Sequence, residues 1–197
     1  MVWRRWPEFK DDERDLVVAI DRSKGRRIVV YSIVVSCVRY QYLLVKYSKV
    51  FKHCKDLSKR ERRVYLPKAL RLIGRFVDQG VLLGLDVMQN IRVLLSRVES
   101  IRDRMYFAFI DDVFLSKNVV KNIFKDIFVL PEYAVRKASL LKSYGLSSSA
   151  LKTLVNIADN LAYYVRWQVE ETDSSLLKVK RKLPLKWTLS ARDHPCP

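Results

Sequence analysis

Two short apolar runs, 16–20 and 28–38, stand near the start of the chain, and both are rich in β-branched residues. A polar link that contains Gly25 separates them, so together they predict a β-hairpin. Because apolar side chains occupy both faces of each run, we expect strands that are covered on both sides, as in the central sheet of an α/β protein. Two later apolar runs, 81–86 and 105–110, predict further strands of the same sheet.

The segments between and after these strands have the apolar spacing of helices. This spacing predicts amphipathic helices over 40–55, 91–101 and 119–128, and Pro131 is placed to begin a helix that extends through Leu141. A hairpin followed by alternating helices and strands is typical of an α/β layered sheet that is partly antiparallel and partly parallel.

Residues that favour helix ends divide the remaining helical segments. Ser58 is a candidate N-cap for the basic segment that follows it, and Pro67 fits the first turn of a helix that ends near Gly80. The serines at 147–149 are candidate caps for a long helix, whose apolar face recurs at helical spacing over 151–165.

Basic residues are concentrated in two stretches of a chain whose formal net charge is +17. The stretch 46–75 has 11 Lys and Arg residues against 2 acidic ones, and 178–197 has 6 against 1. A concentrated basic surface attracts polyanions, so we expect a nucleic-acid partner, either DNA or RNA; the alternative is a solvated basic surface without such a partner. The residues expected to bind nucleic acid are Lys49, Lys52, Lys55, Lys59, Arg60, Arg62, Arg63, Lys68, Arg71, Arg75, Lys178, Lys180, Arg181 and Lys182.

The length of 197 residues suits one compact domain. The predicted elements place a single α/β domain at 16–175, after an N-terminal extension, 1–15, and before a basic C-terminal tail, 176–197. Pro184 interrupts the tail, which we expect to be mobile or to lie on the surface. No apolar run is long enough to cross a bilayer and no signal core follows the N-terminus, which favours a cytoplasmic protein without a membrane partner.

Aspartates stand at the ends of three predicted strands: Asp21, Asp86, and the pair Asp111 and Asp112. In open α/β sheets, ligands bind at the carboxyl ends of the strands. If these strands run in the same direction, their carboxylates gather at one edge of the sheet, where mutual repulsion favours a bound cation such as Mg²⁺ or Mn²⁺. The alternative is that each aspartate belongs to a turn or caps a helix.

Asp159 is an acid within the apolar pattern of the long predicted helix. Val155 and Ala162 are its neighbours on the helix surface. An acid on the apolar face needs a partner, so Asp159 is a candidate fourth carboxylate that reaches toward the strand ends. The alternative is a position on the polar side of the helix, next to Asn156 and Asn160.

Three motifs together resemble a known superfamily. The first strand ends in AID, with Asp21; a later strand ends in FIDD, with Asp111; and a late helix has the sequence IADNLAYYVR, with Asp159. This pattern resembles the ribonuclease H-like superfamily. It is particularly similar to small uncharacterised prokaryotic proteins of that fold that end in an "ADxxA" helix, here Ala158, Asp159 and Ala162.

The resemblance implies a mixed sheet, with an antiparallel hairpin plus parallel strands, flanked by helices. It also implies that Asp21, Asp111 and Asp159 are catalytic metal ligands, which hold two divalent ions, Mg²⁺ or Mn²⁺, for phosphodiester hydrolysis. Asp86 and Asp112 are further candidate ligands because of their strand-end positions.

This chain departs from the pattern of those relatives at specific positions. Arg22 stands where they usually have a second acid, and two strands precede the first helices, where ribonuclease H has three. No histidine lies close to Asp159 in the sequence. His53 and Cys54 are adjacent, which is poor spacing for zinc ligands, so we expect no zinc site.

These observations favour a metal-dependent nuclease, with the basic 46–75 region positioning the substrate backbone. The alternative is a non-catalytic nucleic-acid-binding or nucleoprotein-assembly protein with a degenerate ribonuclease H-like fold. A third, lesser hypothesis is a structural subunit of a larger nucleoprotein particle.

Overall fold

The computed structural model describes residues 15–110, 128–131, 141–142, 146–187 and 189. Within these ranges, six strands form one mixed sheet in the order β5-β4-β1-β2-β3-β6. The strands are β1 (Leu16–Lys24), β2 (Val29–Cys37), β3 (Leu82–Met88), β4 (Met105–Ile110), β5 (Phe128–Pro131) and β6 (Lys186–Trp187). β2 is antiparallel to β1 and β3, β3 is antiparallel to β6, and β4 is parallel to β1 and β5. The prediction of an α/β protein with a sheet of mixed direction is therefore confirmed.

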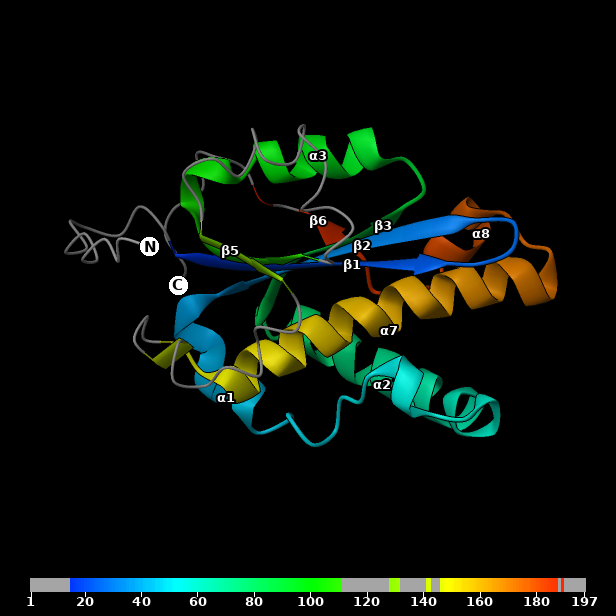
Figure 1. Ribbon diagram of the computed structural model, residues 1–197, viewed down its shortest axis with the longest axis horizontal. Helices are drawn as coiled ribbons and strands as arrows, with labels where there is room; N and C mark the ends of the chain where they lie inside the picture. Colours follow the sequence, from blue (N-terminus) through cyan, green and yellow to red (C-terminus); the bar gives the residue numbers. More distant parts are fainter. Residues whose placement is uncertain (1–14, 111–127, 132–140, 143–145, 188, 190–197) are drawn as a thin grey trace.

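Helices cover both faces of this sheet (Figure 1). One face carries α3, and the other carries α1, α2 and α7. The helices are α1 (Gln41–Val45), α2 (Lys59–Asp78), α3 (Ile91–Glu99), α7 (Ser148–Thr172) and α8 (Leu176–Lys180), and short 3-10 turns occur at η1 (Val38–Tyr40), η2 (Cys54–Asp56) and η3 (Arg102–Arg104). No helix among the described residues is long and apolar enough to cross a bilayer.

The alternation of β1 divides its side chains between two cores. Leu16, Val18 and Ile20 pack in the core under α3, whereas Val17 and Ala19 pack in the core under α7. Successive side chains of a strand point to opposite faces, so both faces of a central strand must be apolar to be covered. The two-sided apolar pattern of the hairpin follows from this arrangement.

Two helices differ from their predicted lengths. The predicted helix over 40–55 is α-helical only in α1, Gln41–Val45, before the chain turns toward η2. The cap at Ser58 is observed, in a capping box with Glu61, but α2 continues without interruption through Pro67. Pro67 is exposed, so water can satisfy the carbonyl group that loses its intrahelical partner there.

The segment 128–131 is a strand, although the sequence predicts the end of one helix at Phe128 and the start of another at Pro131. Its pairing with β4 outweighs the local helical spacing. Pro131 is the last residue of this edge strand, a place where proline is tolerated. The rest of both predicted helices, except Leu141, lies outside the described residues.

The predicted C-terminal tail is instead part of the domain. Val179 of α8 is 5% exposed and lies in the α7-side core, against which Leu183 and Leu185 also pack. β6 pairs with β3 and extends the sheet by one strand. Apolar residues between the lysines therefore dock this segment, and the prediction of a separate tail from 176 onward is wrong for the part that the structure describes.

Candidate active site

Asp21 points to the α7 side of the sheet. It follows Ala19 at the two-residue spacing of a strand, so it shares the face of Ala19, and its side chain is buried, at 6% exposure. Its antiparallel partner is Ser32, whose hydroxyl donates a 2.8 Å hydrogen bond to the carbonyl oxygen of Ala158 in α7. The face that carries Asp21 is thus joined to α7 at the residue before Asp159.

A polar stripe on α7 holds α1 and the chain segment that follows it. Thr153 donates to the carbonyl oxygen of Leu44 at 3.0 Å, and Asn156 donates to that of Phe51 at 2.7 Å. Asp159 accepts a 2.6 Å hydrogen bond from the backbone N–H of Cys54. These α7 side chains lie one helical turn apart and are buried. Asp159 therefore lies on the inner side of α7, and its partner comes from the loop.

His53 completes the surroundings of Asp159. Its Nδ1 lies 3.0 Å from Oδ2 of Asp159 and 3.3 Å from the backbone nitrogen of Lys55. One nitrogen cannot donate to the first and accept from the second, and the shorter contact with a carboxylate favours a proton on Nδ1. A histidine thus reaches the helix aspartate from 106 positions earlier in the numbering, although none lies near it in the sequence.

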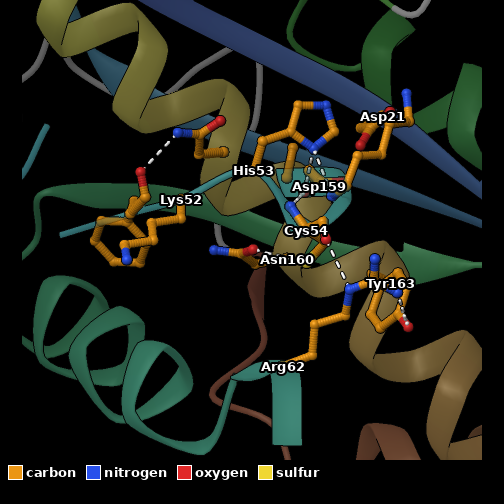
Figure 2. Close-up of polar contacts among 12 residues, drawn as sticks. Asp21, Lys52, His53, Cys54, Arg62, Asp159, Asn160 and Tyr163 are labelled. Atoms are coloured by element: carbon orange, nitrogen blue, oxygen red, sulfur yellow. Dashed lines mark hydrogen bonds and ion pairs between the residues drawn. The ribbon is translucent and has the colours of Figure 1, made fainter. Parts of the chain in front are cut away.

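The pKa of the Cys54 thiol depends on its burial and on the charged groups around it. It is buried, and it donates to Oδ1 of Asn160 at 3.0 Å. Burial raises the pKa of Cys54 most, followed by the charge and hydrogen bonding of Asp159, and Asp21 raises it further; Arg62 opposes these effects. Asp21 and Asp159 therefore act on the same group, and Figure 2 shows both beside His53 and Cys54.

Arg62 fixes α2 to this cluster. Its Nε donates to the carbonyl oxygen of Cys54 at 2.7 Å, and its Nη1 donates to the hydroxyl of Tyr163 at 2.8 Å (Figure 2). The guanidinium also lies 4.9 Å from the centre of the Tyr163 ring. Arg62 was predicted as a nucleic-acid contact, and the structure gives it these internal partners.

Arg22 stands on the other face of the sheet. It follows Ile20 at two-residue spacing, and Ile20 packs in the core under α3. Its backbone N–H donates to Oδ1 of Asp21 at 2.7 Å, but alternation directs its side chain away from the face of Asp21 and Asp159. The basic side chain that replaces an acid in the resembled motif is therefore not directed at the pair.

Asp86 shares the sheet edge with Asp21 but not the face. Its antiparallel partner, Ile33, belongs to the α3-side core. Its carboxylate lies 2.6 Å from Nζ of Lys180 and 3.5 Å from Nε of Arg97. These two cations balance its charge, so Asp86 is apart from the pair formed by Asp21 and Asp159, and Lys180 is engaged here.

Asp111 and Asp112 lie outside the described residues. They follow Ile110, the last residue of β4, directly in the sequence. β4 runs parallel to β1, and Ile110 pairs with Ile20, the residue before Asp21.

Most of the predicted nucleic-acid contacts are exposed. Those of α2 and the loop before it extend along one layer of the molecule, and those after α7 lie on α8 and beyond it. The exposed members are Lys49, Lys52, Lys55, Lys59, Arg60, Arg63, Lys68, Arg71, Arg75, Lys178, Arg181 and Lys182.

Sequence reasoning missed His53 as a neighbour of the aspartate pair, and it named Asn156 and Asn160 only as polar neighbours of Asp159, whereas the structure buries both. A signal for the asparagines was present, because polar residues recur every three or four positions through an otherwise apolar helix. Nothing comparable pointed to His53, which reaches the site only through the path of a loop.

The chain matches no protein-family model, no curated protein and no solved structure.

Proposed function

We propose that the chain is a divalent-metal-dependent nuclease with a ribonuclease H-like fold. The observation that carries the proposal is the approach of Asp21, from β1, to Asp159, from α7, with both carboxylates buried. Buried carboxylates repel each other unless a cation or a proton accompanies them.

The sheet supports the fold part of this proposal. An antiparallel hairpin, β1 and β2, is joined to strands β4 and β5 that run parallel to β1, with helices on both faces. In this proposal, β3 takes the place of the third antiparallel strand of ribonuclease H; it is antiparallel to β2 and enters the sheet after α1 and α2. The two helices are thus an insertion between the second and third strands.

In this proposal, the described residues would supply part of a metal site. They contain no group of three His, Cys, Asp or Glu side chains placed to hold a metal ion. Asp21 and Asp159 provide two oxygen donors of the kind that Mg²⁺ and Mn²⁺ prefer, and Asp111 is the proposed third ligand. When bound, the metal would activate water and stabilise the leaving oxygen of a phosphodiester.

The chain's own residues fix one of these carboxylates. Oδ2 of Asp159 receives the backbone N–H of Cys54 and faces Nδ1 of His53, so both contacts orient the group from one side. His53 and Cys54 are positioning residues in this proposal. The exposed cations of α2 would bind the phosphate backbone without reading sequence.

The decisive experiment is cleavage of fluorescent DNA and RNA oligonucleotides with Mn²⁺ or Mg²⁺, with EDTA as the blank. We expect cleavage by the wild-type chain and loss of about 100-fold or more in Asp21→Asn and Asp111→Asn. Asp86→Asn is the matched control, because that residue stands at the same edge on the opposite face. An equal loss of cleavage in Asp86→Asn would contradict the proposal that Asp21 and Asp159 are the catalytic carboxylates.

One observation favours a second candidate, a nucleic-acid-binding protein without catalysis. The Asp159 carboxylate already has two protein partners, so its burial does not require a metal ion. In that case the chain binds oligonucleotides, cleaves none of them, and shows no rise in melting temperature with millimolar Mn²⁺. This combination of results would reject the nuclease.

A further inference from the structure

A basic groove lies beside the candidate active site, between three elements. It is formed by the β1–β2 turn (24–27), the start of α2 (59–63) and the α7 segment 163–171. Two adjoining hollows, of about 500 and 230 Å³, share Lys59, Arg166, Glu170 and Glu171. Together they reach the size of a pocket for a small ligand.

The groove continues directly from the aspartate pair. Ser23 lies two residues beyond Asp21 on the same face of β1, about 7 Å away, and its Oγ accepts a 2.9 Å hydrogen bond from Nε of Arg166. On α7, Trp167 follows Asp159 by eight residues, a rise of about 12 Å. A strand of nucleic acid held at the pair would cover this distance with a few nucleotides.

The charge of the groove is positive after its acids are counted. Oε1 of Glu170 accepts the backbone N–H of Arg27 at 3.0 Å, and its Oε2 accepts from Nη1 of Arg166 at 3.0 Å. Desolvation acts to raise the pKa of Glu170, but these hydrogen bonds and the charge of Arg166 outweigh it, and the pKa is lowered. Glu171 lies 3.6 Å from Nζ of Lys59. Both acids are thus engaged with cations of the groove.

Three exposed cations of the groove have no acidic partner among the described residues: Lys24, Arg26 and Arg63. Lys24 ends β1 and Arg26 lies in the turn after it, whereas Arg63 comes from α2. They are available for phosphate groups, which Lys and Arg bind readily.

Aromatic rings line the same groove. Two guanidiniums lie close to the Tyr163 ring, that of Arg62 at 4.9 Å and that of Arg166 at 4.6 Å from its centre. One turn along α7, Trp167 is half-buried and packs edge-on against Tyr164, with the ring centres 6.1 Å apart. Aromatic rings next to unpaired cations are the features by which proteins hold single strands.

We propose that this groove binds single-stranded nucleic acid, with an unpaired base stacked on Trp167 and adjacent phosphates on Arg63 and the β1–β2 turn. The direction of the strand toward Asp21 and Asp159 rests on the proposed function; the binding itself does not. A duplex keeps its base faces covered, so it can use the cations but not Trp167. Single strands should therefore bind more tightly than a duplex of the same sequence.

Fluorescence anisotropy in EDTA tests this proposal without catalysis, using labelled single-stranded DNA, single-stranded RNA and the matching duplex. We expect Trp167→Ala to weaken single-strand binding about tenfold or more and Trp167→Phe to retain most of it. Duplex binding should change little in both variants. Arg63→Gln should weaken both kinds of binding and lower the slope of log affinity against log salt by about one.

Two exposed positions outside the groove provide controls: Tyr42→Ala removes an aromatic ring from α1, and Arg92→Gln removes a cation from α3, on the other face of the sheet. Thermal unfolding of each variant shows that it is folded. Duplex binding as tight as single-strand binding, or a loss in Tyr42→Ala equal to that in Trp167→Ala, would overturn the proposal. Binding is measured in EDTA and therefore does not depend on catalysis. A protein that binds as expected here but cleaves no oligonucleotide with Mn²⁺ or Mg²⁺ would reject only the nuclease.

Discussion

The backbone N–H of Cys54 donates a 2.6 Å hydrogen bond to Oδ2 of Asp159, although 105 positions separate the two residues. This bond joins the loop before α2 to the middle of α7 in a buried place. Asp159 is consequently both a candidate site carboxylate and an anchor of the loop. Because of this hydrogen bond, substitution of Asp159 should affect stability as well as any activity.

We expect Asp159→Ala to lower the free energy of unfolding by about 2–3 kcal/mol, because a buried N–H loses a charged acceptor. Asp159→Asn keeps an oxygen acceptor and should cost less. Urea denaturation measures both. Asp78→Ala, which removes an exposed carboxylate at the end of α2, is the control and should change little. An Asp159→Ala variant as stable as the wild type would show that the bond contributes nothing.

The thiol of Cys54 should be nearly inert in the folded protein. Burial and, second, Asp159 raise its pKa, so little thiolate forms near pH 8. We expect alkylation by iodoacetamide to be much slower than in the urea-unfolded chain, as followed by mass spectrometry of the Cys54 peptide. Asp159→Asn should speed the reaction, and Asp21→Asn should speed it less. Equal rates in all three folded proteins would mean that access alone limits the reaction.

The sequence predicted the central elements of the fold better than its margins. The hairpin and β4 have strong apolar runs, and α7 has both a serine cap and a long periodic face, so local signals and packing agree there. β5 and β6 are short strands whose existence depends on a partner strand, which no local pattern reveals.

The candidate site divides in the same way. The position of Asp21 near a strand end and of Asp159 in the helix pattern could be predicted, since each is an acid in an apolar segment. The separation of Asp86 by face depends on strand register, which a single sequence fixes poorly. The contact with His53 depends on a loop path, for which the sequence offers no periodicity.

Tyr65 should make stability depend on alkaline pH. Burial raises its pKa to about 12, against the lowering effect of its hydrogen bonds with Lys52 and Asn160. The unfolded chain ionises near the ordinary value of 10.0, so the contribution of neutral Tyr65 is fully present below that pH and is lost as the pH rises toward 12. We expect Tyr65→Phe to reduce the slope of unfolding free energy against pH in this window. An unchanged slope in urea titrations would contradict the raised pKa.

The segment after α7 should be needed for full stability. Truncation after Ser175 removes Val179 from the core, β6 from the sheet and the Lys180 contact with Asp86. Loss of one buried valine alone costs about 1.5–3 kcal/mol, so we expect a clear fall in melting temperature. A chain that ends at Leu189 keeps these contacts and serves as the control. An unchanged melting temperature after the shorter truncation would show that the segment is only loosely attached.

Gly84 of β3 tests the same docking from the opposite side. A Cβ atom there would lie 2.8 Å from Cδ1 of Leu189, 3.1 Å from Cζ3 of Trp187 and 3.1 Å from Cγ2 of Val35. The contact with Leu189 is shorter than Cβ atoms tolerate, and the other two contacts are tight, so at least one of these side chains must move. We expect Gly84→Ala to lower the free energy of unfolding by about 1–3 kcal/mol.

Gly74→Ala gives the opposite expectation in the same protein. Its Cβ would meet Pro184 at an ordinary 3.5 Å, and alanine favours the helix α2, so stability should rise by about 1 kcal/mol.

The source of the Gly84→Ala cost is found by repeating that substitution in the chain truncated after Ser175, where Trp187 and Leu189 are missing. If these two side chains cause the cost, the cost of Gly84→Ala in the truncated chain should fall to the part due to Val35. Urea denaturation of the full-length and truncated chains, each with and without Gly84→Ala, gives the coupling energy directly. An equal cost in both backgrounds would mean that the C-terminal segment does not pack on Gly84.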